Sequence, residues 1–238
     1  MIKANGWMAL VYALVITGFA LLSELWKGSS GSGVAQLFAA VYLAIPAHLT
    51  VLRNISGKQA MEVLGKRSSG TGNIMSPFLW RAFGMSLLSI LIAAPFFIIA
   101  LMFGAPEYVA YGCGGIGLLA GSVFAFAKWG TMFPAIVAGD NPSMAAASGR
   151  GKQIFGYAAP RLLLCFGLLS VLIFIIAYTG ALLSDGKGEF FCADGRFNFI
   201  FLIGMFLAGL INAYQVVTTA VILSRAYLKA GGSVAAIA

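Results

Sequence analysis

Long apolar stretches separated by short polar segments are the dominant pattern of this sequence. A helix needs about 20 mostly apolar residues to cross about 30 Å of hydrocarbon, and six stretches reach that length. The predicted spans are 6–26, 34–52, 78–103, 109–136, 158–182 and 197–224. Apolar residues follow one another without alternation, as in 162–164, so the strands of a membrane barrel are excluded. The pattern predicts an all-α, polytopic membrane protein in which residues 1–238 form a single transmembrane domain.

Two polar segments between the spans carry a helical pattern of their own. In 58–66, charged residues recur every four positions, while Met61 and Leu64 share another face. In 141–154, Asn141 is a candidate N-cap and Pro142 stands at the first helical position. We expect two short interfacial helices on the cytoplasmic side, although solvated connectors would show the same pattern.

Charged residues are scarce and unequally distributed between the two sides of the membrane. They make up 9% of the chain, whereas 61% is hydrophobic, and a soluble protein has about 25% charged residues. All lysines and arginines except Lys27, Lys187 and Arg196 lie on the side that holds both termini. Because basic segments are retained in the cytoplasm, the N-terminus and the C-terminus are predicted to be cytoplasmic.

The net charge of +8 is concentrated on this cytoplasmic side. Such a cluster predicts contact with anionic membrane lipids or with a membrane partner, although membrane topology alone would also explain it. The candidate contact residues are Lys58, Lys66, Arg67, Arg150 and Lys152. Nucleic acid is not expected as a partner, because basic and aromatic residues do not alternate over a large surface.

Three further cations lie near the cytoplasmic ends of spans. Lys128, beside Trp129, either extends to the membrane surface or joins Arg81 and Arg161 in an inward-facing anion site. Both interpretations remain open from the sequence.

The last span carries a face of neutral polar residues. Asn212, Gln215 and Thr219 are spaced i, i+3 and i+7, and polar side chains of this kind avoid the lipid. They either line a polar pocket or conduction path, or form hydrogen bonds between helices.

The sequence shows no recognisable catalytic apparatus. His48 is the only histidine, and no carboxylate lies at the centre of a span, so we expect no catalytic residue, no metal site and no cofactor. Residues 112–117 satisfy G-x-G-x-x-G, but they lie in an apolar helix and not after a strand, which excludes a dinucleotide site. Cys113 and Cys192 both fall on or near the outer side, where they either form a disulfide or stay free.

Four segments carry a resemblance to a known family: 129–137, 141–148, 152–156 and 223–228. They resemble six-helix bacterial inner-membrane proteins related to the membrane domain of glycerophosphoryl diester phosphodiesterases. The resemblance implies a multi-helix module in the bacterial cytoplasmic membrane. We expect no counterpart of the soluble phosphodiesterase domain in this chain, so the resemblance carries over no catalytic residue.

These observations predict a non-enzymatic integral membrane module, accessory or lipid-associated, that engages anionic lipid or a partner through its basic cytoplasmic face. A small-solute permease or channel is one alternative. A structural subunit of a larger membrane complex, or of a homo-oligomer, is another, with the small residues around Gly117 and Gly121 as helix contacts.

Overall fold

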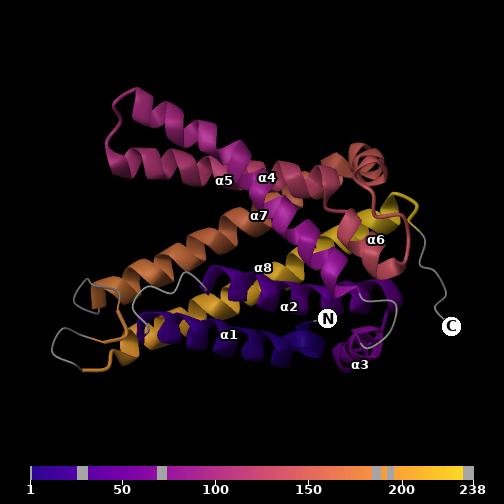
Figure 1. Cartoon of the computed structure of the whole chain (residues 1–238), viewed down its shortest axis with the longest axis horizontal. Helices are drawn as coiled ribbons and strands as arrows, with labels where there is room; N and C mark the ends of the chain where they lie inside the picture. The colour runs from indigo at the N-terminus through magenta and orange to yellow at the C-terminus, as the bar shows by residue number, and fades with distance from the viewer. Residues whose placement is uncertain (1, 26–31, 69–73, 184–188, 192–195, 233–238) are drawn as a thin grey trace.

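The computed structural model describes residues 2–25, 32–68, 74–183, 189–191 and 196–232. Eight helices lie in this part of the chain (Figure 1). They are α1 (Ile2–Leu25), α2 (Ser32–Arg53), α3 (Gly57–Ser68), α4 (Met75–Met102), α5 (Glu107–Trp129), α6 (Met132–Ala138), α7 (Met144–Leu183) and α8 (Phe199–Lys229). Helices α1, α2, α4, α5, α7 and α8 are long and apolar enough to cross a membrane. The predicted all-α, six-span fold is confirmed.

Helix α3 is the short helix expected near 58–66. It begins with a capping box, in which the Gln59 backbone N–H donates to Ser56 Oγ at 3.3 Å and the Ser56 N–H donates to Gln59 Oε1 at 3.0 Å. Ala60 and Leu64 are buried, and α3 packs mainly against α2. The helix is therefore held to the end of the bundle by its apolar face.

The fourth predicted span, 109–136, is too long. Helix α5 ends at Trp129, and residues 132–138 form the separate helix α6, all of whose residues are buried. A Cβ at Gly130 would overlap the carbonyl oxygen of Phe126 and lie 2.7 Å from Leu223 Cδ2, so the chain turns where only glycine fits. The apolar run continues through this turn, which is why hydropathy does not reveal it.

The prediction of a separate interfacial helix at 141–154 is wrong in its boundary. These residues form the first turns of α7, which is continuous from Met144 to Leu183. Pro160 lies inside this helix and cannot donate a backbone hydrogen bond. Figure 1 shows the first turns of α7 viewed end-on and the remainder running across the bundle, a change of direction that the proline explains.

The spans form an open bundle around α8. Helices α1 and α2 pack on one another and on α8, α7 packs between α8 and α5, and α4 forms an antiparallel hairpin with α5. The hairpin diverges from the other helices toward its tip (Figure 1). A Cβ on Gly121 would lie 3.0 Å from the Ser89 carbonyl oxygen of α4, and one on Gly209 would lie 3.2 Å from Ala13 Cα of α1. These small residues thus serve helix packing within the chain.

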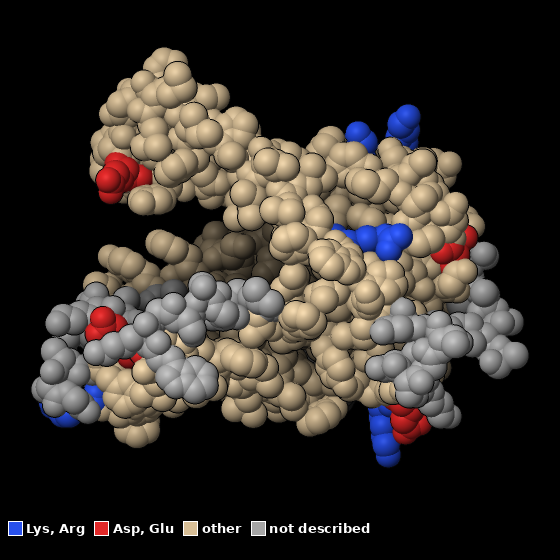
Figure 2. All heavy atoms as spheres, viewed as in Figure 1, with Lys and Arg blue, Asp and Glu red and all other residues tan. Residues whose placement is uncertain are grey.

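Charge is separated along the bundle. Figure 2 shows lysine and arginine gathered mainly at the end where α3, α6 and the first turns of α7 lie, whereas acidic residues occur at both ends. Glu62 of α3 and Asp140 after α6 are the acidic residues among these cations. We call the first end the basic end; its described cations are Arg53, Lys58, Arg81, Lys128, Arg150, Lys152, Arg161, Arg225 and Lys229. The opposite, acidic end holds Glu24, Glu107 and Glu189 together with one described cation, Arg196.

Candidate functional site

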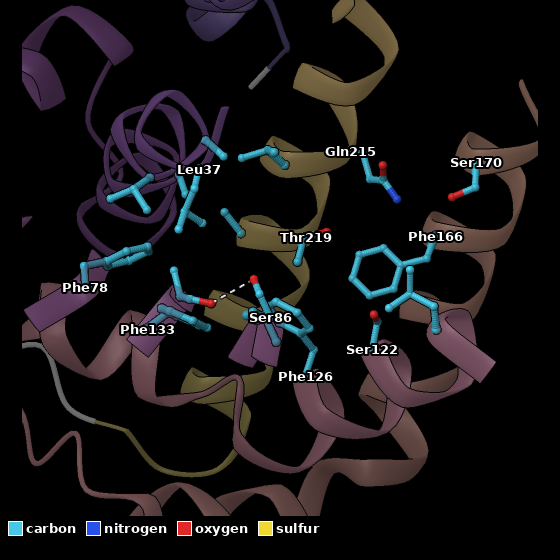
Figure 3. A pocket seen from close by; sticks show the side chains of 18 of the residues that line it. Leu37, Phe78, Ser86, Ser122, Phe126, Phe133, Phe166, Ser170, Gln215 and Thr219 are labelled. Atoms are coloured by element: carbon cyan, nitrogen blue, oxygen red, sulfur yellow. Dashed lines mark hydrogen bonds between the residues drawn. The ribbon is translucent and has the colours of Figure 1, made fainter. Parts of the chain in front are cut away.

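A cavity of about 400 Å³ lies between the helices, within the roughly 300–1,000 Å³ of small-molecule sites. Helices α2, α4, α5, α6, α7 and α8 all contribute to its wall (Figure 3). The wall is mostly aliphatic and aromatic, with four phenylalanine rings: Phe78, Phe126, Phe133 and Phe166. Its polar members are His48, Ser86, Ser122, Ser170, Gln215 and Thr219. No charged side chain lies among the lining residues.

The three polar residues singled out on the last span have two different environments. Gln215 and Thr219 line the cavity. Asn212 instead accepts a hydrogen bond from the Tyr12 hydroxyl through its Oδ1, so it joins α8 to α1. The predicted polar face of α8 therefore does two things. Gln215 and Thr219 form part of a cavity wall, and Asn212 forms a hydrogen bond between helices.

His48 lies at the cavity wall near the basic end. Its side chain is 2% exposed, and its Nδ1 lies 2.7 Å from Ser224 Oγ on α8. The ring centroid of Phe78 is 5.8 Å away. The sequence does not indicate a role for Ser224, because one serine in an apolar span gives no signal of its partner. The pair joins α2 to α8 and leaves Nε2 without a hydrogen bond to any described residue.

Helix α6 forms the cavity wall toward the basic end. Phe133, which is 3% exposed, stacks on Phe126 with ring centroids 5.9 Å apart and lies 4.8 Å from Phe78. Phe126 in turn meets Phe166 of α7 edge to face at 5.7 Å. This aromatic cluster connects α4, α5, α6 and α7 beneath the cavity.

Arg150 holds a polar cluster at the basic end. Its Nη1 lies 3.4 Å from Asp140 Oδ2, its Nη2 donates to the Asn141 carbonyl oxygen at 3.1 Å, and its Nε lies 3.4 Å from Thr131 Oγ1. The Tyr227 hydroxyl donates to the same Asp140 oxygen at 2.8 Å. Arg150 therefore binds the residue before α6 and the turn between α6 and α7, and its guanidinium carbon lies 5.3 Å from the Tyr227 ring centroid of α8. Neither Asp140 nor Tyr227 was a candidate, because the three residues meet only through tertiary contacts.

The pKa of Asp140 is lowered from its ordinary value of 3.8, mainly by the hydrogen bond from Tyr227, with further contributions from the Asn141 N–H and Arg150 and with burial opposing them. A carboxyl whose pKa is depressed by folding contributes stability above its unfolded pKa and loses it as the pH falls through the folded value. We therefore expect the unfolding temperature of the protein in detergent to fall below about pH 4, and the Tyr227→Phe variant to lose part of this dependence.

Glu62→Gln is the matched control for this titration, because Glu62 is exposed on α3. An acid dependence that is identical in wild type and Tyr227→Phe, or one removed by Glu62→Gln, would contradict the assignment to Asp140.

The three cations of the predicted anion site each bind a local partner. Arg81 donates to the Pro77 carbonyl oxygen at 3.1 Å. Lys128 Nζ lies 4.6 Å from the Trp129 ring centroid. Arg161 donates to the Tyr157 carbonyl oxygen at 2.8 Å. No contact among the described side chains brings these three cations together.

The remaining predicted contact residues lie at the basic end. Lys58 on α3 and Lys152 on α7 are exposed, and neither forms a salt bridge with another described residue. Lys66 and Arg67 lie in α3, but their side chains lie outside the described part of the chain.

Two expectations concern thiols and metals. Cys113 is half-buried, and Cys192 lies outside the described residues, so their pairing stays a prediction. Within the described residues, no three His, Cys, Asp or Glu side chains are placed to hold a metal ion.

No protein-family model, curated protein or solved structure matches this chain. The resemblance to the membrane domain of glycerophosphoryl diester phosphodiesterases therefore stays a prediction from the four segments that carry it.

Proposed function

We propose that this protein is a non-enzymatic, lipid-associated module of the bacterial cytoplasmic membrane, with both termini in the cytoplasm and its basic end at anionic lipid head groups. Six helices long and apolar enough to cross a membrane make it an integral membrane protein. The observation that carries the lipid association is the exposed charge of Lys58 and Lys152 at one end of the bundle. Such cations contribute about 1 kcal/mol each beside an anionic membrane surface.

The surface for this contact is smaller than the sequence indicates. Arg150 is committed to Asp140, Asn141 and Thr131, so we leave it out of the lipid contact. Lys58 and Lys152 remain, because their ammonium groups extend from α3 and from the first turns of α7. Two helices that lie apart in the sequence would then contact one membrane surface.

Charge reversal of these lysines tests the proposal. The Lys58→Glu/Lys152→Glu variant should lower retention of phosphatidylglycerol by at least about thirtyfold, equivalent to the ~2 kcal/mol that two lysines contribute, because the two glutamates also repel the lipid. The measurement is native mass spectrometry of protein extracted from mixed phosphatidylcholine and phosphatidylglycerol nanodiscs.

Glu62→Lys is the matched control, because Glu62 lies exposed on α3 and its replacement adds positive charge to the same end. It should raise phosphatidylglycerol retention. Retention that is unchanged in both variants would remove the proposal.

The alternatives receive different support from the cavity and from the glycines. Gln215 and Thr219 in the cavity wall are consistent with a small-solute permease, but a mostly apolar wall without charged groups favours an apolar ligand over a hydrated solute. For the subunit alternative, Gly117 and Gly121 pack against Phe96, Ile92 and Ser89 of α4. They therefore supply no free helix contact for a partner.

A further inference from the structure

We propose that the cavity is a binding site for one uncharged amphiphile taken from the bilayer, whose hydroxyl or carbonyl group is held by Gln215, Ser170 and Ser122. This site is distinct from the basic-end surface of the proposed function and does not depend on it. The polar groups of the cavity, its apolar wall and its opening together specify this class of ligand.

Three polar side chains from three helices meet in the cavity without partners of their own. Figure 3 shows the Gln215 amide of α8 and the Ser170 hydroxyl of α7 pointing toward one another beside Phe166, with Ser122 of α5 on the other side of the same ring. Within the described chain, none of the three makes a side-chain hydrogen bond. In a membrane interior, polar groups without partners are costly, so a ligand that supplies a donor or an acceptor is favoured here.

Ser86 is a serine of this cavity whose hydroxyl is already hydrogen-bonded within its own helix. It lines the same cavity, but its hydroxyl donates to the Ala82 carbonyl oxygen four residues earlier at 3.0 Å (Figure 3). Serines in apolar helices commonly satisfy themselves in this way. Ser122 and Ser170 do not, which leaves their hydroxyls available to a bound molecule.

The charge of the wall excludes an anionic head group. Arg81, Lys128, Arg161 and Arg225 lie within five residues of a lining residue in sequence, and none of them lines the cavity. Arg81, Lys128 and Arg161 are each bound to a carbonyl oxygen or an aromatic ring of their own helix, and Arg225 is exposed. A phosphate or carboxylate in the cavity would be desolvated without a counter-charge, whereas an ester carbonyl or a hydroxyl would find neutral hydrogen-bond partners.

The apolar part of the ligand would contact an apolar part of the cavity wall. Leu37 and Val41 of α2, Phe78 of α4 and Leu119 of α5 line the cavity and present surface for an acyl or isoprenoid chain. Figure 2 shows the molecule hollowed between the α4–α5 hairpin and the helices opposite it, toward the acidic end. We infer that an amphiphile of the bilayer enters the cavity through this hollow.

Photolabelling with a diacylglycerol tests the site. Full-length protein in phosphatidylcholine nanodiscs is irradiated with a dioleoylglycerol analogue that carries a diazirine in one chain, and labelled peptides are identified by mass spectrometry. We expect labelling of cavity residues of α2, α4 and α5. Unlabelled dioleoylglycerol should compete, whereas dioleoylphosphatidic acid, which has the same chains and an anionic head, should not.

Variants separate a specific site from general lipid contact. Gln215→Leu keeps the size of the side chain and should weaken labelling about tenfold, because it removes the central hydrogen-bonding group. Ser122→Ala, a smaller change that preserves folding, should weaken it about fivefold. Ser86→Ala is the matched control and should leave labelling unchanged, because its hydroxyl is already bonded to Ala82.

Three results would overturn the proposal. Equal competition by phosphatidic acid would show that the site does not discriminate between neutral and anionic head groups. Labelling confined to the outer surface of the helices would show that the amphiphile does not enter the cavity. Undiminished labelling in folded Gln215→Leu and Ser122→Ala would show that the polar groups do not hold the ligand.

Discussion

Replacing Gly151 with alanine is expected to remove most of the folded protein. A Cβ at this position would overlap the carbonyl oxygen of Lys128 and lie 2.7 Å from its carbonyl carbon. The obstacle is backbone, which cannot move aside as a side chain can, so α7 and the end of α5 must separate. The expected loss is about 4 kcal/mol or more, measured by thermal unfolding in detergent and by the fraction of monodisperse protein.

Gly149→Ala is the matched control on the same helix. Nothing lies within 4 Å of a Cβ built at Gly149, and alanine is favoured over glycine in a helix by about 1 kcal/mol. This variant should be as stable as wild type or slightly more stable. Equal losses at both positions would show that the turns before Pro160 tolerate no change, and that the close approach to Lys128 is not the cause.

Phe133→Ala should produce the second large loss, of about 3–5 kcal/mol. The ring is 3% exposed and packs against Phe78 and Phe126 at centroid distances of 4.8 and 5.9 Å. Its removal enlarges the cavity and leaves the short helix α6 without its main contact to α4 and α5. Thermal unfolding in one detergent is the direct measurement.

Phe103→Ala controls for the loss of a phenyl ring as such. Phe103 follows α4 at the tip of the hairpin and is 86% exposed, so its removal should change stability by about 0.5 kcal/mol or less. A comparable loss in the two variants would mean that detergent contact, and not the packing of α6, determines the stability.

The spans were predictable because a membrane-crossing helix satisfies its backbone hydrogen bonds within itself. Length and apolar character are then enough to locate α1, α2, α4 and α8 to within a few residues. The errors arose at the basic end, where α5 stops at Trp129 and α7 starts at Met144. There, a glycine turn inside an apolar run and a helix that continues past a polar segment change the path of the chain without changing its hydropathy.

The candidate site was only partly accessible to sequence reasoning. The spacing of Asn212, Gln215 and Thr219 places them on one face of α8, but it does not say what that face meets. Gln215 and Thr219 border the cavity, whereas Asn212 meets Tyr12, which lies 200 residues away in the chain. The partners of a helical face are set by helix packing.

The basic end shows the same limit for charged residues. Arg150 and Lys152 are two residues apart and have the same charge, yet Arg150 is bound to Asp140 and Lys152 is exposed. Two residues that are two positions apart in a helix point to different sides of it. Only the position of α8, with Tyr227 beside Asp140, decides which of these sides contacts the rest of the protein.

The sequence by itself determined that this is an all-α integral membrane protein with six spans, because lipid requires each crossing segment to be apolar and internally hydrogen-bonded. Only the tertiary structure decided that the hairpin of α4 and α5 diverges from α8, that α6 turns inward, and that Gln215, Ser170 and Ser122 face one cavity. These features depend on how side chains of distant helices fit together, and hydropathy along a single chain does not contain that information.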